Sequence, residues 1–164
     1  MVGKRWFISG GIKKPVAERL GGKRMKRVIQ TVTGFKNFEV PYTLIMHERP
    51  SSQLAIFLPG EGYTNSRPLF HFAEDIFMNH KIDVLEVDYQ YKEKAYDEFS
   101  MEEISEAVQF DVEKILDFVL GDTSYDQYYI VAKSIGTIAK ITKCEDVELD
   151  GLQLHIETLG RNKF

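Results

Sequence analysis

One serine lies where covalent chemistry is expected, at the turn between a predicted strand and a predicted helix. Ser134 is the centre of the run AKSIG, with Ala132 two residues before it and Gly136 two residues after it. A sharp strand-to-helix turn lifts a serine oxygen above the edge of a sheet, and small flanking residues permit the close backbone packing. The run matches the nucleophile-elbow pattern G-x-S-x-G with Ala132 replacing the first glycine. Ser134 is therefore a candidate nucleophile; the alternative is an ordinary helix N-cap.

A glycine loop after another predicted strand is the second candidate for chemistry. Residues 59–63 read PGEGY and follow the apolar run Gln53–Leu58. Backbone N–H groups in such a loop can turn toward a ligand, and one of them would complete an oxyanion hole with the N–H of Ile135. The alternative is a turn that needs glycine for its geometry alone. A phosphate site is less favoured, because neither G-x-x-x-x-G-K-[ST] nor a full G-x-G-x-x-G is present.

The elements that carry these two loops alternate between strands and helices. The predicted strands are Val28–Thr33, Phe38–Met46, Gln53–Leu58, Ile82–Val87, Tyr128–Ala132 and, more weakly, Leu152–Leu159. Three helices are predicted. The first is capped by Ser66, the second begins at a Ser100–Glu103 capping box and ends at Gly121, and the third is Thr137–Lys143. Such alternation predicts an α/β fold, a three-layer α/β/α sandwich with a mostly parallel sheet. Ligands bind at the carboxyl ends of the strands in that architecture, where both loops lie.

From about residue 25 to about residue 140 the chain resembles the α/β-hydrolase family, specifically small bacterial serine esterases and acyl hydrolases. The resemblance is carried by the runs LAIFLPGEGYTNSRPLF, IDVLEVDYQY and YYIVAKSIGTIA, in that order. It implies a partial α/β-hydrolase fold and a serine hydrolase acting on esters. It also implies Ser134 as the nucleophile, with oxyanion N–H groups supplied by Ile135 and by Glu61 or Gly62.

The residues after the serine depart from the family's pattern. The family's triad runs Ser, then Asp or Glu, then His in chain order. His155 is the sole histidine after Ser134, and the acids there are Glu145, Asp146, Glu148, Asp150 and Glu157. The resemblance would put His155 on or near the first strand beyond the elbow rather than on a late loop. We therefore expect a chain truncated after the elbow helix, with an incomplete triad and His155 as the candidate base. The alternative is a non-catalytic pseudoenzyme that acts in binding only.

The remaining histidines, the single cysteine and the acidic residues predict no second site. His71 lies on the flank of the apolar face of its helix, His80 lies at the end of that helix, and His47 lies in a loop before Pro50. We expect each of these histidines to be structural or exposed. Cys144 has no evident base partner, and no His, Asp and Glu set has the spacing of a metal site. We expect neither a metal nor a cofactor.

Composition predicts a single domain with a basic extension. The chain has 164 residues, of which 43% are hydrophobic and 28% are charged, and it has one cysteine. The net charge is −4, but the charges are unevenly distributed, because Lys and Arg residues are concentrated before residue 28. We predict a basic, flexible and dispensable N-terminal extension over residues 1–24 and a single partial α/β-hydrolase-like domain over residues 25–164. The alternatives for the extension are an arm for nucleic acid or an anionic surface, and an upstream start before a true Met25.

The same features set expectations for partners. An acidic body argues against nucleic acid as the main ligand, because phosphate contacts dominate such affinity. No apolar stretch has the length of a membrane span, and one cysteine excludes a disulfide framework within the chain, so a cytoplasmic protein is expected. The expected partner is a small ester-like substrate. A truncated sheet would leave an unpaired edge near the elbow strand, through which a homodimer can form.

Overall fold

A computed structural model describes residues 16–20, 23–60, 62–89, 98–121, 123 and 125–139. Its centre is a six-stranded sheet in the order β1-β2-β3-β5-β4-β6. The strands are β1 (Val16–Leu20), β2 (Lys23–Thr33), β3 (Glu39–His47), β4 (Gln53–Leu58), β5 (Asp83–Val87) and β6 (Gln127–Ala132). The helices are α1 (Pro68–Asn79), α2 (Met101–Leu120) and the short 3-10 helices Phe35–Asn37 and Ser134–Ile138.

The sheet is mixed, so the prediction of a mostly parallel sheet is wrong. The pairs β1–β2, β2–β3 and β3–β5 are antiparallel, and β4 is parallel to β5 and to β6. The hairpin of β2 and β3 supplies antiparallel pairs at one side, and β3 also lies antiparallel beside β5. The predicted strands Ile82–Val87, Gln53–Leu58 and Tyr128–Ala132 correspond to the neighbours β5, β4 and β6, and β6 is the last strand on that side of the described sheet. Their common direction brings their carboxyl ends to one edge.

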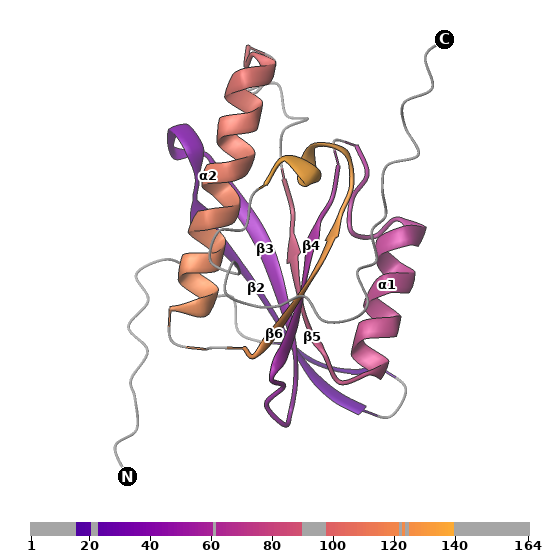
Figure 1. Ribbon diagram of the computed structural model, residues 1–164. Helices are drawn as coiled ribbons and strands as arrows, with labels where there is room; N and C mark the ends of the chain where they lie inside the picture. Colours follow the sequence, from indigo (N-terminus) through magenta and orange to yellow (C-terminus); the bar gives the residue numbers. More distant parts are fainter. Residues whose placement is uncertain are drawn as a thin grey trace.

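Two helices cover opposite faces of the sheet, which confirms the three layers (Figure 1). On the α2 side Leu54, Ile56 and Leu58 pack in one core cluster with residues of α2. On the α1 side Ala55 and Phe57 pack in a second cluster with residues of α1. Successive residues of β4 therefore point to opposite faces, and five of its six residues are buried. Burial on both faces explains why the run is apolar without alternation.

The residues at the N-termini of α1 and α2 explain where the two helices begin. The predicted capping box at α2 is confirmed: the Glu103 N–H donates to Ser100 Oγ at 3.2 Å, and the Ser100 N–H donates to Glu103 Oε2 at 3.0 Å. At α1 the N-cap is Arg67, so the predicted Ser66 cap is wrong. Pro68 starts that helix without any side-chain cap, because its ring presets φ and its missing N–H needs no acceptor.

Part of the predicted N-terminal extension takes part in the sheet. Strand β1 and the first two residues of β2 lie before residue 25, and β1 pairs antiparallel with β2. The dispensability of residues 1–24 stays a prediction. In the described part of the chain, neither long helix is apolar enough over a sufficient length to cross a membrane.

Candidate active site

Ser134 occupies a strained backbone position at the carboxyl end of the sheet. Strand β6 ends at Ala132, and the 3-10 helix Ser134–Ile138 begins two residues later. Ser134 has a φ of 53°, in the left-handed region that residues other than glycine rarely occupy. Its side chain is exposed, whereas Ile135 is buried. The predicted tight turn with an exposed serine is confirmed, and such strained residues cluster at functional sites.

Gly136 allows the elbow to pack directly on the end of β4. A Cβ at Gly136 would overlap the carbonyl oxygen of Leu58 and lie 2.8 Å from that of Pro59. Two backbone hydrogen bonds fix the turn: the Lys133 N–H donates to Leu58 O at 3.0 Å, and the Gly136 N–H donates to Lys133 O at 3.0 Å. A glycine two residues after the serine is therefore a steric requirement of this turn. The predicted helix Thr137–Lys143 is a 3-10 turn as far as residue 138, and most of its remainder lies outside the described residues.

The structure brings the two predicted loops together at Gly60. A Cβ at Gly60 would lie 2.7 Å from Ser134 Cβ and 3.0 Å from Lys133 O. The loop then turns back, because the Tyr63 N–H donates to Gly60 O at 3.1 Å and Gly62 has a φ of 71°. The glycine loop thus borders the serine directly. Gly62 and Ile135 are on the described loop and elbow, and Glu61 lies outside the described residues.

Lys133 and Tyr63 form a part of the site that the sequence interpretation missed. Lys133 Nζ lies 4.7 Å from the centroid of the Tyr63 ring. That ring is held in place, since Tyr63 Oη accepts the Leu69 N–H at 3.2 Å and the ring centroid is 5.9 Å from that of Phe70. The only available signal for Lys133 was its position directly before the candidate nucleophile.

Within the described residues, the Ser134 hydroxyl has no hydrogen-bond partner. The main chain of the residue is engaged, because Thr137 Oγ1 donates to Ser134 O at 2.6 Å. The candidate base His155 and the acids after residue 144 lie outside the described residues. The described part of the chain therefore presents a serine and its surrounding backbone, and none of its histidines is hydrogen-bonded to the serine hydroxyl.

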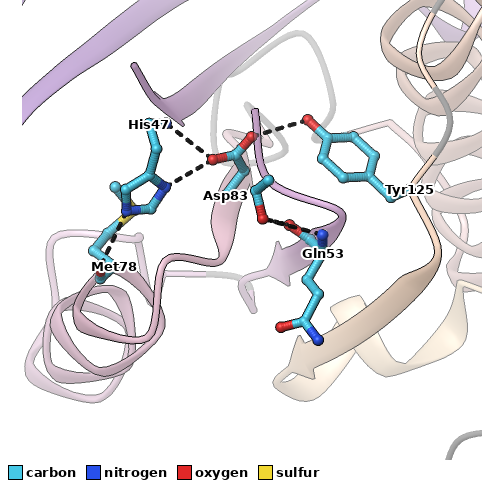
Figure 2. A network of polar contacts seen from close by, with 6 residues as sticks. His47, Gln53, Met78, Asp83 and Tyr125 are labelled. Atoms are coloured by element: carbon cyan, nitrogen blue, oxygen red, sulfur yellow. Dashed lines mark hydrogen bonds and ion pairs between the residues drawn. The ribbon is translucent and has the colours of Figure 1, made fainter. Parts of the chain in front are cut away.

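His47 belongs to a structural network at the opposite edge of the sheet (Figure 2). Its Nδ1 lies 2.9 Å from Asp83 Oδ1, and its Nε2 lies 3.0 Å from Met78 O. Tyr125 Oη donates to the second carboxylate oxygen at 3.3 Å, and both burial and Asp83 raise the pKa of Tyr125. Asp83 begins β5, whereas Ser134 follows the end of β6, so this histidine faces away from the serine. The predicted loop at His47 is wrong, since it is the last residue of β3.

The other described histidines lie on α1 or at its end and are exposed. His80 caps the helix, with its Nδ1 2.8 Å from Ile76 O. No group of three or more His, Cys, Asp or Glu side chains in the described ranges could hold a metal ion.

Glu86 and Asp88, at the carboxyl end of β5, are carboxyls whose pKa is raised by burial. Burial, reinforced by Glu74 and opposed by Arg27, raises the pKa of Glu86 to about 7. Arg27 Nη2 lies 3.0 Å from Glu74 Oε1 and 3.9 Å from Glu86 Oε2. Burial also raises the pKa of Asp88, against a hydrogen bond from Asn65 Nδ2 at 3.0 Å. These contacts lie at the end of β5 and do not include Ser134.

Comparisons with known proteins give similarity at the level of the fold. No protein-family model matches the sequence, and no curated protein matches it. A cold-adapted esterase from an Arctic intertidal metagenomic library matches with a TM-score of 0.57 and 16% identity, over 78% of this chain and 57% of the esterase. An esterase of Pyrococcus furiosus matches with a TM-score of 0.54 and 13% identity, over 69% of this chain and 45% of the esterase.

Brefeldin A esterase, a bacterial homologue of human hormone-sensitive lipase, matches with a TM-score of 0.53 and 14% identity. That match covers 74% of this chain and 35% of the esterase. The chain thus spans 57% of the first of these structures and smaller shares of the other two.

Proposed function

We propose that this chain is a serine hydrolase of the esterase or acyl-hydrolase class. Part of the α/β-hydrolase fold of its esterase neighbours is present in the chain, which supports the proposal. Its substrate is a small molecule with an ester or similar carbonyl, and the reaction needs no cofactor. The observation that carries the proposal is the φ of 53° at Ser134, in a strand-to-helix turn with the side chain exposed. A plain N-cap does not need this conformation, because N-cap residues have extended backbone angles.

The proposed reaction is acyl transfer to Ser134 followed by hydrolysis. Ser134 Oγ attacks the carbonyl carbon while a base, for which His155 is the candidate, takes the hydroxyl proton. The backbone N–H groups of Ile135 and of Glu61 or Gly62 stabilise the oxyanion of the tetrahedral intermediate. The intermediate collapses as the alcohol leaves with a proton from the base. Water then releases the acid by the same steps and restores the serine.

A non-catalytic binding domain is the second candidate. It is favoured by the lack of a hydrogen-bond partner for the Ser134 hydroxyl among the described residues. It is also favoured by the placement of His47 at the far edge of the sheet. Loss of the base in a serine hydrolase costs on the order of 10⁴–10⁶ in rate, so such a domain would keep the turn without useful turnover.

Hydrolysis of a short-chain p-nitrophenyl ester separates the two candidates. The assay compares wild type with Ser134→Ala, His155→Ala and, as a matched control, Ser66→Ala in the exposed loop before α1. The hydrolase proposal expects turnover in wild type and Ser66→Ala, with a loss of at least about 10³-fold in Ser134→Ala. A similar loss in His155→Ala would identify the base. Equal background rates in wild type and Ser134→Ala would establish the non-catalytic alternative.

A further inference from the structure

Lys133 places a positive charge beside the candidate nucleophile, and we propose that it selects ester substrates that carry a carboxylate on the acyl group. This inference rests on the proposed function, because it names the substrate class of the same site. The substrates are monoesters of dicarboxylic acids, in which one end is the reactive ester and the other end is an anion.

The backbone of Lys133 is rigid, so its side chain leaves from a fixed point. Its N–H donates to Leu58 O at 3.0 Å, and its carbonyl oxygen accepts the Gly136 N–H at 3.0 Å. A Cβ on Gly60 would come within 3.0 Å of the same carbonyl oxygen. Two hydrogen bonds to two separate segments, with Gly60 packed close to the carbonyl group, therefore hold the residue that precedes Ser134. Preorganisation of this kind lowers the cost of binding a ligand at the side chain.

The ammonium group is held on the α1 side of the sheet by an aromatic ring. Lys133 Nζ lies 4.7 Å from the centroid of the Tyr63 ring, within the range of a cation–π interaction. Tyr63 packs against the core cluster on the α1 side, which includes Val131 of β6. The side chain of Lys133 therefore points toward α1, while its Cα is adjacent to that of Ser134 at about 3.8 Å.

The charge of Lys133 is not neutralised by any carboxylate in the described part of the chain. Arg27 and Lys36, in contrast, form ion pairs with Glu74 and Glu103. An aromatic ring attracts an ammonium group but leaves its full charge, so the charge stays available to an anion. A lysine recognises carboxylate as a point charge and needs no bidentate geometry. A substrate whose anion lies a few bonds from its ester carbonyl would contact Lys133 and Ser134 together.

The test compares two esters of equal chain length, p-nitrophenyl hexanoate and the p-nitrophenyl monoester of adipic acid. The variants are Lys133→Met and, as a matched control, Lys114→Met. Lys114 is exposed on α2 with its Nζ 5.5 Å from the Phe110 ring centroid, so it has the same type of contact away from the site. We expect Lys133→Met to lower kcat/KM for the adipate monoester about tenfold, which is ~1.4 kcal/mol. The kcat/KM for the hexanoate ester should fall much less, so that the ratio of the two esters changes, and Lys114→Met should match wild type on both esters.

Two kinetic outcomes would overturn the proposal. An equal loss of kcat/KM on both esters in Lys133→Met would show that Lys133 serves the reaction or the fold rather than substrate selection. Unchanged kcat/KM on both esters would show that the ammonium does not contact the anion. The preference should also shrink in 1 M NaCl, where the Debye length is about 3 Å.

A binding measurement keeps the inference separate from the proposed activity. Monomethyl adipate and methyl hexanoate are titrated separately into Ser134→Ala protein, with Lys133 present or replaced by Met. NMR chemical-shift changes of the protein measure the binding of each ester. The inference expects tighter binding of monomethyl adipate only when Lys133 is present. Equal binding of monomethyl adipate with and without Lys133 would overturn it. If wild type hydrolyses neither ester but the difference in binding is found, the hydrolase proposal fails and the anion site stands.

Discussion

Glu86 offers a sharp test of the electrostatics of β5. Its carboxyl is buried on the α1 side, where Arg27 Nη2 lies 3.9 Å from it and bonds more closely to Glu74. Burial, reinforced by Glu74, raises the pKa of Glu86 from 4.5 to about 7. The folded chain therefore holds this proton more tightly than the unfolded chain does. The stability that Glu86 contributes is fully present below pH 4.5 and is lost as the pH rises toward 7 and beyond.

The substitution Glu86→Gln keeps the volume of the side chain and removes the buried charge. A pKa change from 4.5 to about 7 corresponds to about 3 kcal/mol at a pH above both values. At pH 8 we expect Glu86→Gln to exceed wild type in free energy of unfolding by up to about 3 kcal/mol. Near pH 4, where the carboxyl is protonated in both states, we expect little difference.

Urea denaturation at several pH values from 4 to 8 measures this effect. Glu106→Gln, at an exposed position of α2, is the matched control and should show no such trend. A difference between Glu86→Gln and wild type that does not change with pH would refute the reasoning, because it would show that the pKa of Glu86 is the same in the folded and the unfolded chain.

Three further predictions concern other contacts and are tested by urea denaturation. Gly136→Ala should destabilise the chain by about 2–4 kcal/mol, because its Cβ would overlap the Leu58 carbonyl; full stability would contradict the packing of the elbow. Asp83→Ala should cost about 3 kcal/mol, since His47 and Tyr125 lose their shared acceptor, and a cost below 1 kcal/mol would contradict that network. Ser134→Gly should be more stable than Ser134→Ala by about 1 kcal/mol, because only glycine has a φ of 53° without strain; the reverse order would contradict it.

Local patterns predicted the elements that carry the site. Strand β4 and the capping box at Ser100 depend on neighbouring residues, and both are present as expected. The elbow was predictable for the same reason, since Gly136 and Ser134 are two residues apart. The contact between Gly60 and Ser134 followed from the parallel direction of β4 and β6, which brings the ends of both strands to one edge.

Pairing between distant segments was not predictable from these patterns. A proline inside a strand usually marks an edge strand or a bulge, yet β3, which contains Pro41, lies between β2 and β5. The proline is tolerated because pairing with β5 starts at Tyr42, and Pro41 uses only its carbonyl oxygen to accept the Asp88 N–H at 3.0 Å. Lys133 was missed because its contact with Tyr63 joins two loops, and neither loop marks that contact in its own sequence.

Covalent labelling of the chain with a fluorophosphonate probe is the most direct test of Ser134 as a nucleophile. Intact mass spectrometry measures how much probe is bound, and peptide mapping finds the modified residue. We expect one probe per chain, attached to Ser134, and no labelling of Ser134→Ala, whereas Ser66→Ala should react as wild type does. Absence of labelling in wild type, or equal labelling of Ser134→Ala, would contradict the proposal that Ser134 carries the chemistry.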